Sequence, residues 1–391
     1  MLTKLLQPEI QEYIRENSVQ PITKLALQKN PFPDVEWSEI LNQIAALQKA
    51  KDKLPTWFKT QNIIYPSKVS VEQTSSETAA EYKSGLIFGE NLIDLTGGFG
   101  IDDYYFSKKV RQVVHCELNE NLSAIANHNF NVLGVTNIEC LPGDSLDTLN
   151  RLDKQWDWLY ADPARRSDTK GKVFMLKDCL PNVPDLLDTY FKYTDNIIIK
   201  TAPLLDITAG MSELYFVKDI HIVAVNNEVK ELLWILKKGF TGIPDIIAVN
   251  LTKEGTDTFK TSLSNCGEAV YGLPKTFLYE PNSAIMKSGA FDAVGETYRL
   301  EKLHKHSQLY TSEVLVNFPG RRFTVDYIVP YQKAEMKQYI EGKKMNVTAR
   351  NFPLQVTDIL KKWKIKDGGD VYAFFTTNIA DEKVVLLCSK A

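Results

Sequence analysis

A glycine-rich turn between a short apolar stretch and a helical pattern constrains this chain more than any other feature. Residues 91–95 are mostly apolar and include Asp94, and Gly98 and Gly100 follow directly before the helical pattern. Glycine lacks a Cβ, so the backbone here bends sharply and lets a ligand come close. The first turn of the helix also offers unpaired N–H groups. A dinucleotide fingerprint needs a third glycine three residues later, where this chain has Asp103, so that interpretation fails.

Strand-like and helix-like stretches alternate from this turn onward, which predicts an α/β fold with a doubly wound parallel sheet. The stretch 228–238 fits a helix or a strand equally well, and the first 60 residues show apolar positions at helical spacing. The expected strands are 91–95, 112–117, 138–141, 156–161, 196–200, 221–225 and 245–251, and the expected helices are 101–110, 120–133 and 183–193.

The C-terminal third is typical of a small α+β module. Residues 252–276 are expected to form a linker or the exit from the last strand of the sheet. Beyond them, the expected strands are 314–316, 323–329, 371–376 and 384–387, and the expected helices are 282–288, 333–340 and 357–363.

Length and composition predict a globular protein of two or three domains, since the chain has 391 residues with ordinary apolar and charged fractions. Its five cysteines are scattered and form no C-x-x-C pair, so neither a disulfide framework nor a zinc site is expected. We find neither the apolar core of a signal peptide nor a membrane-spanning run. These features favour a cytoplasmic protein with no metal and no membrane partner; they leave the oligomeric state open.

Acidic residues fall at the ends of four successive expected strands. Asp94, Glu117, Asp144 and Asp162 occur in this order along the chain. Open α/β sheets bind ligands at the carboxyl ends of their strands, so these four side chains are expected around one ligand site. Any one of them alone is explained as well by a loop or a helix cap.

The spacing from Asp94 to Gly100, acidic-x-x-x-Gly-x-Gly, resembles the first motif of class I S-adenosylmethionine-dependent methyltransferases. Together with the stretches 72–77, 162–166, 278–287 and 349–353, it makes the chain resemble a bacterial family of such enzymes with a THUMP-like C-terminal domain, over about residues 57–377. The resemblance implies a Rossmann-like methyltransferase sheet after an N-terminal helical region, and ferredoxin-like and THUMP-like parts in the C-terminal module. The expected domains are residues 1–85 (helical region), 86–275 (catalytic domain), 276–319 (ferredoxin-like) and 320–391 (THUMP-like).

The same resemblance implies S-adenosylmethionine as the cofactor and assigns roles around it. Glu117 is expected to bind the ribose hydroxyls, Asp144 and Ser145 the adenine amino group, and Asp94 the methionine end. Thr74 and Glu77 also fit a capping box for a helix through Tyr82, which is compatible with contacts from residues 73–75 to methionine. The full expected cofactor set is Thr74, Ser75, Asp94, Thr96, Gly97, Gly98, Phe99, Gly100, Asp102, Glu117, Leu118, Asp144 and Ser145.

The expected catalytic stretch is Asp162, Pro163, Arg165 and Arg166, which resembles the Asp-Pro-(Pro/Ala)-Arg of 5-methyluridine RNA methyltransferases. Those enzymes need a cysteine after strand five, where this chain has residues 200–203, Lys-Thr-Ala-Pro. Direct in-line transfer to a nitrogen or oxygen is therefore expected, with Asp162 orienting the acceptor or taking its proton. The two arginines are expected to hold a phosphate, to stack on a base, or to pair with an acid such as Asp168.

Positive charge gathers in residues 321–366, which hold eleven Lys and Arg against four Asp and Glu; this stretch is +7, whereas the rest of the chain is −10. Such asymmetry is typical of a nucleic-acid-binding module, although a solvated basic face gives the same pattern. RNA is the partner that the THUMP-like resemblance implies. His304 and His306 are expected at the surface rather than on a metal. The expected RNA-binding residues are Arg321, Arg322, Lys343, Lys344, Arg350, Lys361, Lys362 and Lys364, with Tyr327, Phe352 and Trp363 as stacking faces.

The sequence thus predicts an S-adenosylmethionine-dependent methyltransferase that acts on a nitrogen or oxygen of an RNA nucleotide. Two alternatives stay open: an RNA-binding protein with a degenerate Rossmann core and no activity, and a methyltransferase for a protein or small molecule.

Overall fold

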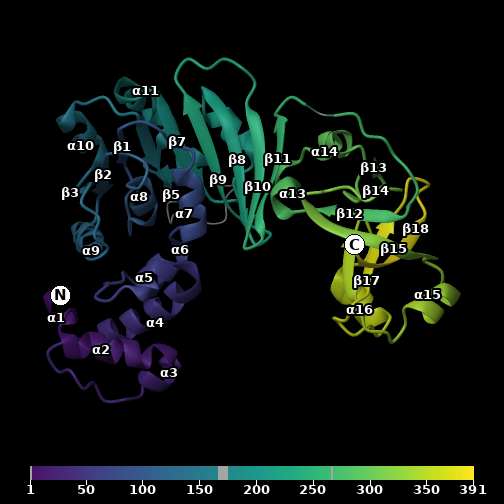
Figure 1. Cartoon of the computed structure of the whole chain (residues 1–391), viewed down its shortest axis with the longest axis horizontal. Coiled ribbons are helices and arrows are strands. Elements are labelled where there is room, and N and C mark those ends of the chain that lie inside the picture. Colours follow the sequence, from purple (N-terminus) through teal and green to yellow (C-terminus); the bar gives the residue numbers. More distant parts are fainter. Residues whose placement is uncertain (1, 166–174, 266) are drawn as a thin grey trace. The chain divides into compact units, whose positions relative to one another are not determined.

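The computed structural model describes residues 2–165, 175–265 and 267–391 (Figure 1). Arg166, one of the expected catalytic residues, and Asp168, its suggested partner, lie outside the described residues. The chain divides into two compact units: Met1–Lys218 with Leu232–Thr241, and Asp219–Glu231 with Gly242–Ala391. The four expected domain ranges stay predictions.

The N-terminal residues of the first unit are helical, as the apolar spacing predicts. Their buried side chains, among them Ile10, Ile44 and Trp57, share one core with Phe99 of the glycine-rich turn and Ile101 of the helix after it. The helices are α1 (Leu2–Leu5), α2 (Pro8–Glu16), the 3₁₀ turn η1 (Asn17–Val19), α3 (Ile22–Leu25), α4 (Trp37–Lys53), α5 (Pro55–Lys59), α6 (Lys68–Gln73) and α7 (Glu77–Ser84).

The expected capping box at Thr74 and Glu77 is wrong. The N-cap of α7 is Ser76, whose Oγ accepts from the Ala79 N–H at 3.2 Å. Glu77 instead accepts from the backbone N–H and hydroxyl of Thr56, both at 2.6 Å, and from the hydroxyl of Tyr105 at 2.8 Å. The Glu77 carboxylate therefore binds residues distant in the sequence and does not form the cap that the local pattern predicts.

A mainly parallel sheet forms the centre of the first unit. Its strands are β1 (Asn91–Asp94), β2 (Gln112–Glu117), β3 (Ile138–Pro142), β4 (Trp158–Ala161), β7 (Asn196–Thr201) and β9 (Glu228–Lys237), in the order β9-β7-β4-β1-β2-β3. The order reverses at β1, which pairs in parallel with both β2 and β4. Such a switch point is where open α/β sheets bind ligands.

Helices follow these strands much as the alternation predicts. They are α8 (Ile101–Phe106), α9 (Glu120–Val132), α10 (Ser145–Leu152), α11 (Val183–Tyr193) and α12 (Ile207–Glu213), with the short elements β5 (Ala164–Arg165), η3 (Leu176–Asp178) and β6 (Cys179–Leu180) after β4. The ambiguous stretch 228–238 forms a strand, β9, because Leu232–Lys237 pairs antiparallel with β7. Residues 232–236 are all apolar and buried, and such a continuous apolar run shows no periodicity to separate helix from strand.

The second unit contains two sets of strands. In the first set, β8 (Val217–Val225) and β10 (Asp245–Thr252) are parallel, and β11 (Gly255–Ser262) pairs antiparallel with β10. The expectation of a linker at 252–276 is therefore wrong for residues 255–262. Phe259 is buried there, whereas its neighbours on the strand are mostly exposed and polar. Because most of its residues are polar, this edge strand lacks the apolar pattern from which a strand is predicted.

The other set is a seven-stranded sheet in the order β13-β14-β12-β15-β18-β17-β16. One face packs Phe323 and Phe374, and the other packs Phe375 with Met336 and Ile359 from α15 and α16. The expected strand 314–316 is not formed, and Val314 is exposed. The elements are β12 (Phe277–Pro281), α13 (Ser283–Ser288), α14 (Phe291–Tyr298), β13 (Glu301–Lys302), β14 (Tyr310–Ser312), β15 (Gly320–Pro330), α15 (Lys333–Tyr339), β16 (Asn346–Arg350), α16 (Val356–Lys362), β17 (Tyr372–Thr377) and β18 (Lys383–Lys390).

Candidate functional site

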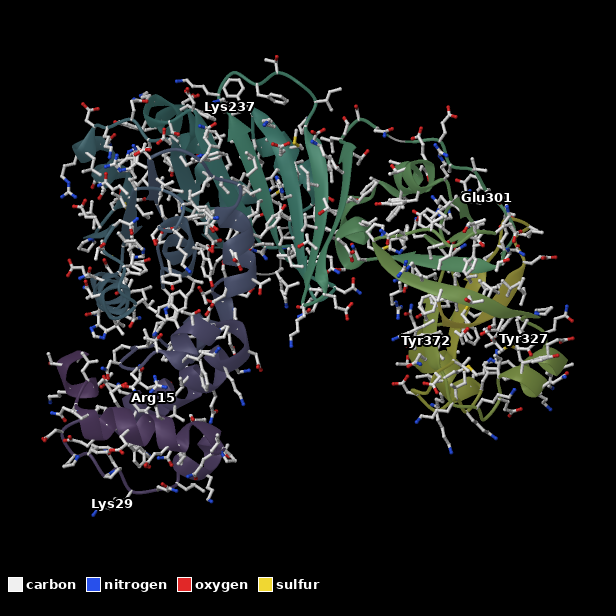
Figure 2. The ribbon with its side chains drawn as sticks, viewed as in Figure 1. Arg15, Lys29, Lys237, Glu301, Tyr327 and Tyr372 are labelled. Atoms are coloured by element: carbon white, nitrogen blue, oxygen red, sulfur yellow. The ribbon has the colours of Figure 1, made fainter. Side chains whose placement is uncertain are left out.

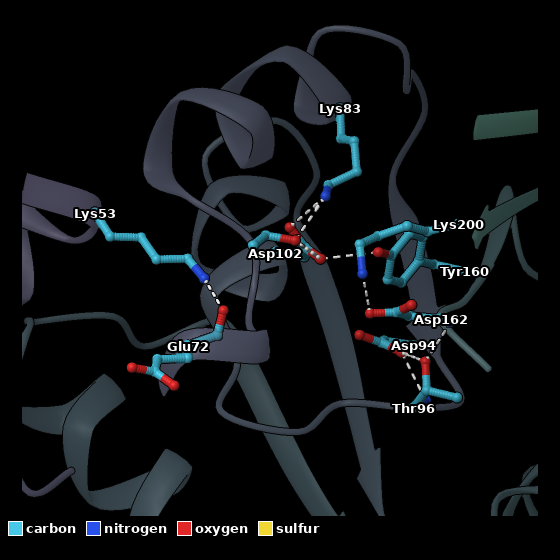
Figure 3. A network of polar contacts seen from close by, with 10 residues as sticks. Lys53, Glu72, Lys83, Asp94, Thr96, Asp102, Tyr160, Asp162 and Lys200 are labelled. Carbon is cyan, nitrogen blue, oxygen red and sulfur yellow. Dashed lines mark hydrogen bonds and ion pairs between the residues drawn. The ribbon is translucent and has the colours of Figure 1, made fainter. Parts of the chain in front are cut away.

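The ends of β1 and β4 are joined by hydrogen bonds at the carboxyl edge of the sheet (Figure 3). Oδ1 of Asp94 accepts from the backbone N–H of Thr96 at 2.7 Å and from its hydroxyl at 3.0 Å. The Thr96 hydroxyl oxygen in turn accepts from the backbone N–H of Asp162 at 2.7 Å. Two of the predicted acidic strand ends are therefore held side by side through one threonine.

The glycines of the turn are needed for two different reasons. Gly98 and Gly100 have φ of 58° and 79°, a region that favours glycine. A Cβ on Gly97 would lie 2.2 Å from the His115 ring, and one on Gly100 would lie 2.3 Å from Phe130. A Cβ on Gly98 would meet nothing among the described residues closer than the Thr96 carbonyl oxygen at 3.7 Å. The chain therefore packs tightly beneath the turn and leaves open space above Gly98.

Glu117, at the end of β2, lies against this turn. Its Oε2 accepts from the Gly98 N–H at 2.9 Å, and its Oε1 accepts from the Asn119 N–H at 2.7 Å. An ionised carboxylate has about four lone-pair sites, so acceptor capacity for a ligand remains. The next residue, Leu118, is 74% exposed, which places an apolar side chain in solvent beside an acidic one.

Asp144 follows β3 and lies next to Glu117 along the edge, because the Gly143 N–H donates to the Glu117 carbonyl oxygen at 3.0 Å. The Oδ1 of Asp144 caps α10 by accepting from the N–H groups of Leu146 and Asp147. Asp144 is exposed and Ser145 is half-buried. Asp144 therefore caps a helix and also lies at the edge of the sheet beside Glu117, as the sequence predicts.

A buried ion pair lies behind the turn and involves residues that the sequence did not reveal. Nζ of Lys83, on α7, lies 3.0 Å from Asp102 Oδ1 and 2.8 Å from Ser75 Oγ. Oδ2 of Asp102 accepts from the Ser75 and Tyr160 hydroxyls at 3.0 and 2.8 Å (Figure 3). Burial alone would raise the pKa of Asp102, but Lys83 and Lys200 hold that pKa below its ordinary value. Ser75 and Asp102, both predicted, are therefore brought together by Lys83 and Tyr160.

Two further carboxyl groups are fully buried under the turn. Burial and the neighbouring Asp103 raise the pKa of Asp94 well above its ordinary range. Burial and Asp102 do the same to the pKa of Asp103, whose Oδ2 lies 2.6 Å from Nδ1 of His115. Burial lowers the pKa of His115. Burial therefore shifts Asp94, Asp103 and His115 toward their neutral forms, and a cation beside Asp94 would favour its ionised form.

Asp162 pairs with Lys200, the next-to-last residue of β7 (Figure 3). Strands β4 and β7 are neighbours, with Ala161 opposite Ile199, so the residues that follow these two positions meet at the edge. The Lys200 side chain is largely buried, and that of Asp162 is about one-third exposed. Sequence reasoning missed Lys200, although its position near the end of the expected fifth strand was the available signal.

The other predicted residues of this region occupy different surroundings. Pro163 is buried, and Arg165 lies in β5, opposite Cys179 of β6. Phe99 packs its ring into the core near Trp57, so only its backbone faces the turn. Thr74 is half-buried in the connection between α6 and α7.

The basic residues of the second unit do not form one free surface. Arg321 and Arg350 both pair with Glu280, whose side chain is buried. Trp363 is buried in the core, so its prediction as a stacking face is wrong; Phe352 is half-buried against Tyr331. The amphipathic spacing of α16 did not distinguish a core indole from an exposed one.

The remaining basic residues have different environments. Arg322 is half-buried on β15, and Lys361 and Lys364 are exposed at the end of α16. Nζ of Lys362 donates to the Tyr331 hydroxyl at 3.1 Å. His304 is half-buried: its Nε2 lies 3.3 Å from Asp381, and its Nδ1 lies 2.9 Å from the Asn351 amide. The described residues contain no group of three or more His, Cys, Asp or Glu arranged to hold a metal ion.

Comparison with known protein families and structures agrees with this architecture. A ferredoxin-like domain family matches residues 277–319, and a THUMP domain-like family matches residues 320–390. A crystal structure of a "putative methyltransferase" from Porphyromonas gingivalis W83 is 30% identical, covers 100% of this chain and 98% of its own, and superposes with a TM-score of 0.88. The sheet order and the glycine turn define a class I methyltransferase fold. The chain belongs to the family of class I methyltransferases with a THUMP-like C-terminal domain.

More distant structures resemble only part of the chain. An rRNA methylase from Streptococcus thermophilus is 13% identical and covers 41% of this chain and 93% of its own, with a TM-score of 0.30. M. capricolum TrmK in complex with S-adenosyl-homocysteine is 16% identical and covers 41% and 69%, with a TM-score of 0.32. No curated protein matches the sequence. Among the helices of the described residues, none combines the length and apolar character that a bilayer crossing requires.

Proposed function

We propose that this protein transfers a methyl group from S-adenosylmethionine to a nitrogen or oxygen of an RNA nucleotide. The observation that carries the proposal is the placement of Asp94, Glu117, Asp144 and Asp162 along one edge of the sheet, around the glycine turn. A vicinal diol, a purine amino group and a cationic amino group each need acceptors, and carboxylates supply them.

The residues present fit this cofactor. The open space above Gly98 admits a ligand, and the exposed Leu118 offers an apolar surface for the adenine ring beside the carboxylate of Glu117. Glu117 would hold the ribose hydroxyls, Asp144 the adenine amino group, and Asp94 the methionine amino group. When bound, the cofactor supplies a methyl group on a sulfonium, which is a good leaving group.

Asp162 is proposed to accept the hydrogen bond, and then the proton, of the attacking nitrogen or oxygen. Lys200 is a positioning residue, because its ammonium group holds one carboxylate oxygen of Asp162 and leaves the other for the acceptor. Pro163 restricts the backbone directly after Asp162. These residues supply orientation and proton transfer, which is what in-line transfer from a sulfonium requires.

A covalent mechanism is disfavoured by the state of the thiol that lies opposite Arg165. Cys179 lies opposite Arg165 in the short β5–β6 pair. Burial raises its pKa to about 11, so at neutral pH it is a thiol and a poor nucleophile. Direct transfer to a nitrogen or oxygen is consistent with this arrangement.

RNA as the substrate class rests on the second unit. Residues 320–390 match a THUMP domain-like family, and the stretch 321–366 carries a net charge of +7. A polyanion partner accounts for this charge through phosphate contacts. A protein or small-molecule substrate would not account for the exposed lysines Lys343, Lys344, Lys361 and Lys364.

The test combines a binding and a turnover measurement on the full chain. We expect micromolar or tighter cofactor binding by calorimetry, and transfer of label from methyl-labelled cofactor to one fraction of cellular RNA. Asp162→Asn should lower the single-turnover rate by about 10²-fold or more with cofactor affinity nearly unchanged. Asp195→Asn, at the opposite end of β7, is the matched control and should leave both unchanged.

Three results would contradict parts of the proposal. Absence of cofactor binding would favour the RNA-binding protein without activity. Label in protein or in small molecules, with none in RNA, would remove the RNA assignment. Loss of cofactor affinity in Asp162→Asn in proportion to the rate would move Asp162 into the cofactor site.

A further inference from the structure

The second unit contains a surface pocket in its THUMP-like part that combines aromatic, apolar and basic side chains. The pocket has a volume of about 630 Å³. Its lining includes Tyr327 of β15, Tyr339 of α15, Lys343, Lys344 and Met345. We propose that this pocket holds one unstacked base of single-stranded RNA, a subsite that deepens the proposed function and rests on it.

Tyr327 is presented to solvent by an irregularity of its strand. The pairing of β15 with β18 shifts between Val325 and Tyr327, so Asp326 is an extra residue, a β-bulge. Bulges re-aim the side chains beside them, and Tyr327 (labelled in Figure 2) is 61% exposed. The exposed Tyr327 ring is not part of the hydrophobic clusters described for the two faces of this sheet.

The surroundings of this ring suit a planar base. The Tyr327 and Tyr339 centroids are 6.2 Å apart with the rings tilted by 35°. The two rings are too close together and too tilted to hold a base between them, so we place the base on one face of the Tyr327 ring, within the pocket. Met345 and Leu387 are buried residues of the lining and give the pocket an apolar floor.

Charge in the pocket suits a phosphate next to that base. Lys343 and Lys344 are exposed, and Lys343 Nζ lies 5.8 Å from the Tyr339 ring centroid. Stacking faces flanked by cations are the arrangement by which proteins bind single strands. In a duplex the bases are already stacked and paired, so the pocket distinguishes single-stranded from double-stranded RNA. Asp326, also in the lining, adds an acceptor for a base amino group.

The test measures fluorescence anisotropy of a labelled single-stranded 12-mer RNA of mixed sequence, with the full chain. We expect Tyr327→Ala to weaken binding roughly 5- to 150-fold, the range for loss of one stacked base. Tyr327→Phe should retain affinity, because the stacking face remains. Ile328→Ala is the matched control: Ile328 is the next residue of β15, is 49% exposed and does not line the pocket, so its loss should change nothing.

The lysines have a different signature. Lys343→Ala with Lys344→Ala should flatten the slope of log K against log salt by up to about 0.7 for each lost phosphate contact. Tyr327→Ala should leave that slope unchanged. Wild-type affinity in Tyr327→Ala, or equal affinity of the wild type for the same sequence as a duplex, would overturn the pocket.

Failure of the pocket and failure of the proposed function are distinguishable. If the wild type methylates RNA while Tyr327→Ala binds the 12-mer normally, the pocket assignment is overturned and the function stands. If the 12-mer binds through Tyr327 while label enters only protein or small molecules, the pocket stands and the RNA methyltransferase proposal falls. A 12-mer that the wild type does not bind, when an acidic peptide is bound instead, also overturns the pocket.

Discussion

Removing the negative charge of Asp102 should strongly destabilise the first unit. The Lys83 side chain is 0% exposed and that of Asp102 is 11% exposed, with 3.0 Å between Lys83 Nζ and Asp102 Oδ1. At that distance and an effective dielectric constant of about 20, the attraction is about 5.5 kcal/mol. Asp102→Asn keeps the shape but leaves a buried ammonium without its counter-ion, which costs about 3–5 kcal/mol.

A double variant separates the charge effect from packing. Lys83→Met with Asp102→Asn removes both charges, so the double variant should recover much of the loss. Glu90→Gln is the control for an exposed pair: Arg111 and Glu90 lie 3.3 Å apart with side chains 85% and 67% exposed, and its loss should cost less than about 1 kcal/mol.

Urea unfolding followed by tryptophan fluorescence suits this experiment. Five of the six tryptophans, Trp37, Trp57, Trp156, Trp158 and Trp234, lie in the first unit, so the signal reports mainly on it even if the two units unfold separately. The reasoning is refuted if Asp102→Asn costs less than about 1 kcal/mol, or if the double variant is no more stable than Asp102→Asn alone.

Two further predictions concern the cofactor. Glu117→Ala should weaken cofactor binding by about 1–3 kcal/mol, measured by calorimetry, because the ribose hydroxyls lose their acceptor; unchanged affinity in a folded variant would remove that role. Cofactor affinity should also fall as the pH is lowered. Burial and Asp103 raise the pKa of Asp94, so without cofactor this carboxyl group keeps its proton to a higher pH than an ordinary aspartic acid. A cationic amino group binds the ionised form of Asp94, so lowering the pH opposes binding. Binding in that range should release a proton, so the observed binding heat should differ between two buffers of different ionisation enthalpy; equal observed heats in the two buffers would contradict the prediction.

Local sequence patterns were enough for the fold class and for the edge where the acidic strand ends meet. Strand periodicity and the glycines placed Asp94 and Glu117 correctly, because the carboxyl ends of parallel strands share one edge. In the same way, the edge position of Asp162 followed from the order of the elements alone.

The partners of these residues were decided only by tertiary structure. Lys83 and Lys200 reach the acidic residues from α7 and β7, and nothing in their local sequence marks a buried cation. Glu77 accepts a hydrogen bond from Thr56 and does not form the expected cap. Local patterns record which residues repeat on one face of an element. They do not indicate which side chain of a distant element will lie beside a given charge. The ion pairs therefore depend on the tertiary structure.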